Sequence, residues 1–389
     1  MTVEDSTPSN SPFLGPPEEL PGPAARPLPL AVRGAVIVLA LFLTVGGASQ
    51  MINPAFGIWF TEIFIFLGVP WVMLRASHYE PLGYTGLESP TLGPAALGFG
   101  LGVANFFAFV APIQYTAQAL APPWLREIFD GSRIFEGLSA LELGVMLLGV
   151  SIAAPVCEEF FFRGLFQKGV LGASLSRVSA VLVTAVVFSA FHLDPVGFAA
   201  RLELGVLFGA LRLYTGSLWP AILAHSANNV VSSLLFLGIR QFAPADMDAR
   251  PSLLALLAVS SVGICAMGGL LLLARNVPAL WGPRQEPPTL IQPAPSVPRL
   301  LLPWLGAATL SLGLLVLVDL RGIHLRMIDM ELKLPKVPKD APQKLQKERE
   351  NLLQLREDAR SGRIPAEAYK EERVRQSQAH PAEPEPENE

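Results

Sequence analysis

Residues 138–168 read LSALELGVMLLGVSIAAPVCEEFFFRGLFQK, an unbroken run in which apolar side chains dominate. As an α-helix with a rise of about 1.5 Å per residue, such a run exceeds the roughly 30 Å of hydrocarbon in a bilayer. Three charged residues, Glu158, Glu159 and Arg163, stand close together in its second half. Because charge is costly to bury in lipid, a membrane span that keeps this group indicates a functional site as well as a fold.

Apolar runs of similar length recur on both sides of this one. They cover about residues 31–49, 54–75, 92–113, 138–168, 177–193, 196–213, 217–238, 252–274 and 300–320. The chain of 389 residues is 51% hydrophobic and only 16% charged, with a mean hydropathy of +0.42, which is typical of a membrane protein. Unpaired backbone groups are too costly in lipid for open strands. The sequence therefore predicts an all-α polytopic transmembrane helix bundle with about eight to nine spans.

The polar segments divide the chain into domains. Residues 1–29 are rich in proline, serine and glutamate and have no apolar period, which indicates a disordered tail and not a signal peptide. The transmembrane bundle then covers 30–275, a proline-rich linker covers 276–299, and an additional transmembrane helix covers 300–320. The remainder, 321–389, is a charged tail in which leucines at helical spacing predict a helix over about 342–378.

Charge and cysteine content exclude other classes of protein. A net charge of -4 and a pI near 5.8 provide no basic surface for nucleic acid. The two cysteines, Cys157 and Cys265, lack the spacing of a disulfide framework or a zinc knuckle. Basic residues before the first run and after the second favour a cytoplasmic N-terminus. With nine spans the C-terminal tail would lie outside, whereas its own basic residues favour the cytoplasm. The side on which the tail lies therefore stays open.

Helix periodicity fixes the internal geometry of the charged group at 158–163. Glu159 and Arg163 are one turn apart and can form an ion pair, while Glu158 points about 100° away. Glu158 is then the carboxylate without a partner, and in a low-dielectric cavity it suits a general base. The alternative is an ion network that only locks the helices together.

Two further polar groups follow in later apolar runs. Phe188 and His192 are one turn apart close to a probable helix end. His225 and Asn229 share one face of another helix, where an imidazole and an amide can donate together to a developing oxyanion. Asn229 could equally be a contact to a neighbouring helix. Asn228 faces elsewhere and is a weaker candidate.

The depth of each group in the bilayer decides whether the three groups can meet. Counting along the helices from one face puts Glu158 at roughly 16 Å, His192 at roughly 24 Å and His225 at roughly 12 Å. All three depths fall within the bilayer. We therefore expect the three groups to line a common cavity.

Taken together, the three motifs resemble those of a known family. Glu-Glu-x-x-x-Arg at 158–163, Phe-x-x-x-His at 188–192 and His-x-x-x-Asn at 225–229 are similar in order and spacing to the motifs of the CAAX protease and bacteriocin-processing (CPBP or Abi) family. The resemblance covers roughly 140–235, which would be the peptidase core. It implies an intramembrane glutamic endopeptidase that hydrolyses peptide bonds of membrane-associated peptides or proteins.

The resemblance also implies roles for individual residues. Glu158 would activate a water molecule with help from His192. His225 and Asn229 would stabilise the oxyanion of the tetrahedral intermediate. The supporting residues, which would hold the geometry of the site, are Glu159, Arg163 and Phe188.

Two alternatives stay open at this point. Zinc could supply the nucleophilic water if Glu158, His192 and His225 were its ligands, although no cofactor is expected because a Glu–His dyad with an amide partner needs no metal. A non-catalytic scaffold, transporter or bacteriocin-immunity protein could use the same residues as structural contacts. The expected partners are membrane lipids and a substrate within the membrane, and the alanine- and proline-rich composition favours a bacterial plasma membrane. The residues identify neither the substrate nor the oligomeric state.

Overall fold

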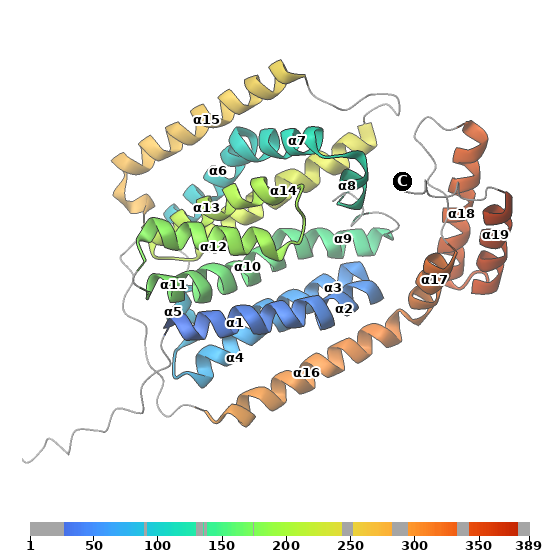
Figure 1. Cartoon of the computed structure of the whole chain (residues 1–389), viewed down its shortest axis with the longest axis horizontal. Helices are drawn as coiled ribbons and strands as arrows, with labels where there is room; N and C mark the ends of the chain where they lie inside the picture. The colour runs from blue at the N-terminus through green and yellow to red at the C-terminus, as the bar shows by residue number, and fades with distance from the viewer. Residues whose placement is uncertain are drawn as a thin grey trace, which may run out of the picture.

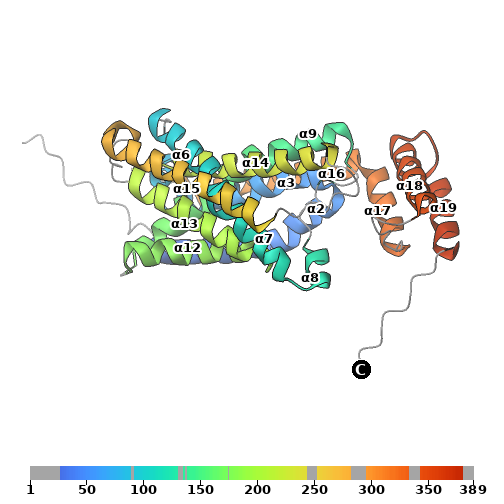
Figure 2. The ribbon, with the colours of Figure 1, turned by 90° about the horizontal axis from the view of Figure 1, so that it is seen from above.

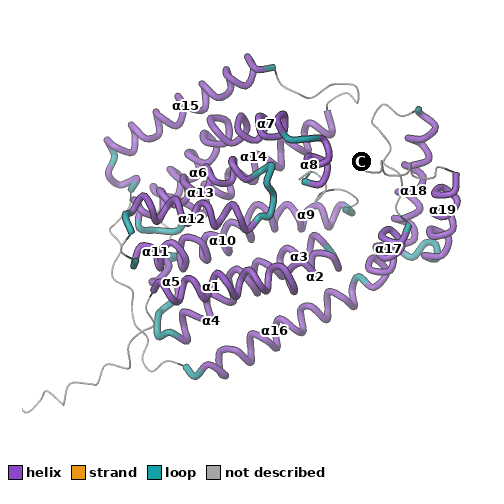
Figure 3. Tube along the Cα trace, in the orientation of Figure 1, coloured by secondary structure: helices purple, strands orange, loops and turns teal. Residues whose placement is uncertain are grey.

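The computed structural model of the protein describes residues 27–88, 92–129, 135, 138–173, 175–242, 252–281, 295–332 and 342–379. Throughout these ranges the chain is helical and has no β-strand (Figure 3), which confirms the predicted all-α fold. The predicted disordered tail lies outside the described residues, except for 27–29, which begin the first helix. The centre of the predicted linker, 282–294, also lies outside them.

Six helical runs of the described chain are long and apolar enough to cross a membrane. In chain order the first three are Pro27–Ile52 (α1 Pro27–Leu41, π-helical η1 Phe42–Gly46, α2 Gly47–Ile52), Pro54–Ala76 (α3 Pro54–Phe60, η2 Thr61–Leu67, α4 Gly68–Ala76) and Leu92–Leu120 (α6 Leu92–Asn105, η3 Phe106–Val110, α7 Ala111–Leu120). The fourth, which carries the first motif, is Ala140–Leu171 (α9 Ala140–Leu148, η5 Gly149–Ala153, α10 Ala154–Glu159, η6 Phe160–Gln167, α11 Lys168–Leu171). The last two are the single helices α15 (Leu253–Asn276) and α16 (Val297–Val318). Each agrees with one predicted apolar run. The protein is therefore an integral membrane protein, but the predicted count of eight to nine spans is not confirmed.

The other three predicted runs are helical but do not meet the same standard of length and hydropathy. They are α12 (Arg177–Phe191), α13 (Phe198–Thr215) and α14 (Trp219–Phe242). The first has only 15 residues, and α13 carries three charged side chains, Arg201, Glu203 and Arg212. Short helical segments within the connections are α5 (Pro81–Thr85), α8 (Pro123–Ile128) and η7 (Pro278–Leu280).

The helices of the bundle run side by side along the long axis of the molecule (Figure 1). In that view α15 and α16 lie at opposite edges of the bundle, and the large apolar side chains of both helices are mostly exposed. Outward-facing apolar side chains on an edge helix suit contact with lipid. Seen from above, the C-terminal helices stand beyond one end of the bundle (Figure 2).

Close packing of α6 against α14 fixes the position of the third motif. A side chain on Gly98 would collide with the backbone of Pro220, and one on Gly102 would collide with the backbone of Ala224. Because glycine has no Cβ, the two helices approach backbone to backbone, as the small residues of the run predict. Ala224 directly precedes His225, so this helix contact fixes the position of His225 relative to α6.

The C-terminal segment folds into three helices, α17 (Leu320–Glu331), α18 (Gln343–Ser361) and α19 (Ala366–Ala379). They share a small apolar core of their own, formed by Leu325, Ile328, Leu352, Ala359 and Tyr369. We call these three helices the C-terminal module. The single helix predicted over 342–378 is interrupted, because Gly362 adopts a left-handed φ of 79° at the C-cap of α18 and Pro365 follows shortly after.

Candidate active site

Glu159 and Arg163 form a buried ion pair at the centre of the bundle. Both side chains are 0% exposed, and Nη1 of Arg163 donates to Oε1 of Glu159 over 2.7 Å. Nη2 of Arg163 donates to the carbonyl oxygen of Gly205 on α13 over 3.1 Å. This confirms the pairing that the one-turn spacing predicts. The arginine therefore joins the helix of the first motif to α13.

His225 contacts the same carboxylate. Its Nδ1 lies 3.0 Å from Oε1 of Glu159, so one carboxylate oxygen serves both Arg163 and His225. The imidazole stacks on Phe208, with ring centroids 4.8 Å apart and planes inclined by 20°. Phe188 presents its edge at 5.8 Å, and the guanidinium of Arg163 lies 4.5 Å from the centroid of the same phenyl ring. The rings of Phe188 and Phe208 therefore line this part of the site, and both lie within cation–π distance of Arg163.

Glu158 has no such partner. Its side chain is half-buried, and its Oε2 atom is buried without a hydrogen-bond partner within the described structure. The carboxylate interacts electrostatically with His225, Glu159 and Arg163. In the first motif one carboxylate is therefore ion-paired and the other is not, as the spacing predicts, although Oε2 of Glu159 is also buried without a hydrogen-bond partner among the described residues.

His192 lies at the C-cap of α12, next to the other imidazole but not bonded to it. Its Nδ1 lies 2.9 Å from the carbonyl oxygen of Phe188, one turn earlier, and its charge would interact with that of His225. The next residue, Leu193, has a left-handed φ of 54°, which is uncommon for a side chain other than glycine and often marks a functional turn. Asp194 then caps the turn by accepting from the backbone of Val196 over 2.9 Å.

Asn229 links the third motif back to the helix of the first. Its Nδ2 donates to the carbonyl oxygen of Val150 over 2.9 Å, and its Oδ1 accepts from Nδ2 of Asn228 over 3.0 Å. Asn228 was predicted to face elsewhere; it is instead a direct support of Asn229. The structure thus brings all three motifs to one region of the bundle, although neither histidine forms a hydrogen bond to Glu158.

Glu62 is a further carboxylate at this site, and the sequence motifs do not include it. It lies on η2, its side chain is only 4% exposed, and its Oε2 has no hydrogen-bond partner among the described residues. It interacts electrostatically with Glu158. Two interacting carboxylates are costly to ionise together in a medium of low dielectric. The signal was present in the sequence, because Glu62 is an acidic residue inside the apolar run 54–75.

A zinc site would require three or four ligands around one point. Throughout the described ranges, no three side chains of His, Cys, Asp or Glu come together closely enough to hold a metal ion. The proposed ligand set of Glu158, His192 and His225 is therefore not assembled in this conformation. The expectation that no cofactor is needed stays a prediction.

Comparison with known proteins identifies the segment that carries these motifs. Residues 140–231 match the family model described as type II CAAX prenyl endopeptidase Rce1-like. A search of curated proteins and a search of solved structures gave no match. The match begins at the start of α9 and ends just after Asn229, so it encloses all three motifs. Over these residues the chain is therefore similar to the CAAX protease (CPBP) family.

Proposed function

We propose that this protein is a glutamic intramembrane endopeptidase that hydrolyses peptide bonds of membrane-associated proteins or peptides. A membrane protease follows from the family match and the apolar helices; the catalyst and its residues are the proposal. The observation that carries it is the contrast between two adjacent carboxylates. Oε1 of Glu159 is bonded by both Arg163 and His225, whereas no hydrogen bond or ion pair to Glu158 is found within the described structure; the Oε2 atom of each carboxylate is buried without a partner.

In this proposal Glu158 takes a proton from water, and the resulting hydroxide attacks the carbonyl carbon of the scissile peptide bond. The proton then passes to the leaving amine as the tetrahedral intermediate collapses. His192 assists Glu158. A backbone carbonyl can only accept, so Nδ1 of His192 must carry the hydrogen in its bond to Phe188. This leaves Nε2 with a lone pair that can accept a hydrogen bond from the attacking water.

The second histidine is suited to the opposite role. Nδ1 of His225 faces the carboxylate of Glu159, which orients the ring. When Nε2 carries a hydrogen, it can donate to the oxyanion. Nδ2 of Asn229 has two hydrogens and uses one of them for Val150, so the other is free to donate. Glu159 and Arg163 hold this arrangement in place, and Phe188 packs against both histidines.

The cellular setting is part of the same proposal. We place the protein in a bacterial plasma membrane on its alanine- and proline-rich composition, and we place its N-terminus in the cytoplasm on the distribution of lysine and arginine around the first two spans. Its partners are membrane lipids and a peptide or protein substrate in the membrane.

The test is a comparison of Glu158→Gln with Glu203→Gln. Glu203 is a second partly buried carboxylate, bonded to Asn105 over 2.8 Å, and serves as the matched control. Quantitative proteomics of membrane proteins, followed by cleavage assays on the purified protein, should show roughly 10²- to 10⁴-fold slower cleavage in Glu158→Gln. Glu203→Gln should cleave as the wild type does. Cleavage at the wild-type rate by a folded Glu158→Gln protein would rule the general base out.

A further inference from the structure

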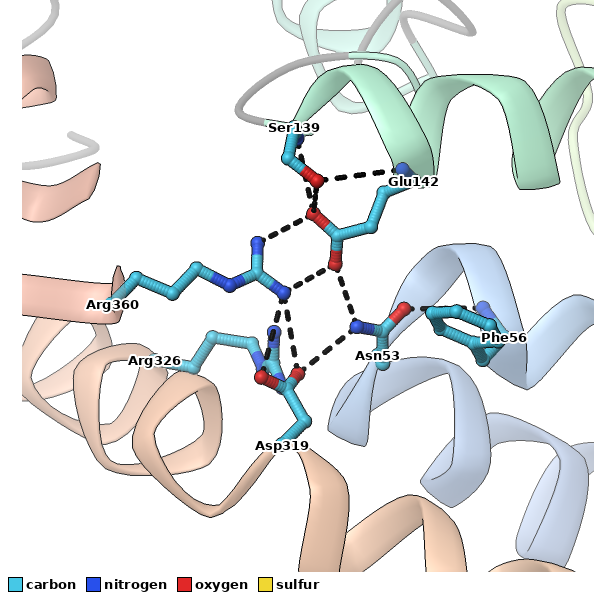
Figure 4. Close-up of polar contacts among 7 residues, drawn as sticks. All are labelled: Asn53, Phe56, Ser139, Glu142, Asp319, Arg326 and Arg360. Carbon is cyan, nitrogen blue, oxygen red and sulfur yellow. Dashed lines mark hydrogen bonds and ion pairs between the residues drawn. The ribbon is translucent and has the colours of Figure 1, made fainter. Parts of the chain in front are cut away.

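A buried ionic network joins the C-terminal module to the end of the bundle where α3 and α9 begin (Figure 4). Its bundle residues are Asn53 and Glu142, and its tail residues are Asp319, Arg326 and Arg360. Asn53 is 2% exposed, Glu142 5% and Asp319 8%. Residues separated by more than 200 positions in the sequence therefore share one set of hydrogen bonds.

Arg360 is the residue that bridges the two carboxylates. Its Nη1 donates to Oε2 of Glu142 over 2.8 Å, and its Nη2 donates to Oε1 of the same carboxylate. Nη2 also lies 3.4 Å from Oδ1 of Asp319. Nδ2 of Asn53 donates to both carboxylates, over 2.7 Å to Glu142 and 3.0 Å to Asp319. Burial lowers the pKa of Arg360, but the attraction of the two carboxylates outweighs it and raises the pKa, so the bridge stays charged.

The two bundle residues of this network are helix caps. Oδ1 of Asn53 accepts from the backbone of Phe56 over 3.1 Å and so starts α3. Glu142 completes a capping box with Ser139 at the start of α9. The run that begins at α3 carries Glu62, and the run that begins at α9 carries Glu158. Arg360 thus bonds the first turn of α9 directly, and it is linked to the first turn of α3 through the two carboxylates to which Asn53 donates.

A series of direct contacts continues from the network toward the site. Nε1 of Trp59 on α3 donates to the carbonyl oxygen of Val145 on α9 over 2.9 Å. At the next turn Gly149 lies so close to Trp59 that a Cβ would be 3.1 Å from its indole nitrogen. Val150 then accepts the hydrogen bond of Asn229. The two runs are therefore packed together between the network and the third motif.

Apolar packing contributes little to the junction itself. A cavity of about 780 Å³ lies beside the network, and its walls come from α3, η2, α9, α16, α17 and α18. The C-terminal module has its own apolar core, which is separate from that of the bundle. A module with its own core, attached across a cavity, depends on its polar contacts for docking.

We propose that Arg360 is a positioning residue for the peptidase site, because it clamps the C-terminal module onto the capped starts of α3 and α9. Docking would keep the two runs in register, so that Glu62, Glu158 and the Val150–Asn229 contact adopt one arrangement. Release of the clamp would loosen the turns around Val145 and Val150. The effect on catalysis rests on the proposed function, whereas the mechanical coupling does not.

The test compares Arg360→Gln, Arg360→Lys and Arg363→Gln in the full-length protein in lipid nanodiscs. Arg363 is the control, because it belongs to the same module but is 61% exposed and, among the described residues, forms an ion pair with Asp358 alone. Hydrogen exchange is measured over residues 140–150 and over α18, together with kcat and KM for cleavage. In Arg360→Gln we expect faster exchange in both segments and a roughly 10- to 100-fold lower kcat, with little change in KM, because misplaced catalytic groups slow the chemical step.

Lysine keeps the charge but lacks the planar fork that bridges two carboxylates, so Arg360→Lys should give an intermediate exchange rate and kcat. It also carries the test if Arg360→Gln proves unstable. The proposal would be overturned if Arg360→Gln exchanged faster in α18 but kept the wild-type exchange rate over residues 140–150 and the wild-type kcat. It would also be overturned if α18 of that variant exchanged as slowly as it does in the wild type. If the wild type and Glu158→Gln cleave equally, the proposed function fails instead, and the exchange data alone decide the coupling.

Discussion

The pair Glu158 and Glu159 allows one substitution to be tested at two adjacent positions with opposite expected results. Glu159→Gln removes the charge that compensates Arg163, whose side chain is 0% exposed. Breaking a buried ion pair by neutralising one partner typically costs about 3–5 kcal/mol. Glutamine keeps the shape and one acceptor for the guanidinium, so we expect a loss of about 3 kcal/mol. This is roughly a 100-fold change in the ratio of folded to unfolded protein.

Glu158→Gln should behave differently, because no ion pair is lost. Its carboxylate has a buried oxygen without a partner, and a neutral amide of the same shape avoids the cost of burying charge. We expect a free energy of unfolding that is unchanged or slightly higher than that of the wild type, while cleavage is lost. Reversible unfolding in mixed detergent micelles, monitored by tryptophan fluorescence, measures both variants. Equal destabilisation by the two substitutions would refute the division into one structural and one free carboxylate.

Three further predictions address the packing and chemistry of the site. Gly102→Ala would place a methyl group against the backbone of Ala224, which should lower the free energy of unfolding by about 1–3 kcal/mol and slow cleavage. The control is Gly144→Ala, where the added carbon would have no described heavy atom outside its own helix within 4 Å, so stability and cleavage should stay unchanged. Equal effects of the two substitutions would contradict the close approach of α6 and α14. Phe208→Leu removes the ring that stacks on His225 and lies 5.2 Å from the guanidinium carbon of Arg163; thermal unfolding should show a loss of about 2 kcal/mol, because a desolvated cation–π contact is worth about that much. Removal of metal by a chelator, checked by elemental analysis, should leave cleavage intact, whereas activity that returns only with added zinc would favour the metallopeptidase alternative.

Local periodicity made much of the fold and of the first motif predictable. A long apolar run leaves few alternatives to a helix in lipid, and six predicted runs became helices of the expected length. A spacing of four residues places Glu159 beside Arg163 in any helical geometry close to 3.6 residues per turn. The predicted free carboxylate at Glu158 follows from the same rule.

Contacts between distant segments were not predictable in this way. The bond from His225 to Glu159 depends on how α14 crosses α10, and no spacing within either helix specifies that crossing. The predicted number of spans is not confirmed, for a related reason. Arg212 on α13 is buried and donates to the carbonyl oxygen of Gly216, so its charge is satisfied inside the protein while it lowers the hydropathy of the helix. Hydropathy alone does not distinguish such a buried charge from one that faces lipid.

Glu62 shows where sequence reasoning could have gone further and where it would have stopped. The rule that makes Glu158 a candidate, an acidic side chain within an apolar run, applies to Glu62 with equal force. The rule says that a partner or a function must exist, but it does not say which. Only the packing of η2 against α10 reveals that the neighbour of Glu62 is another carboxylate. Since two such groups cannot both stay ionised cheaply, the state of Glu62 bears directly on whether Glu158 can act as a base.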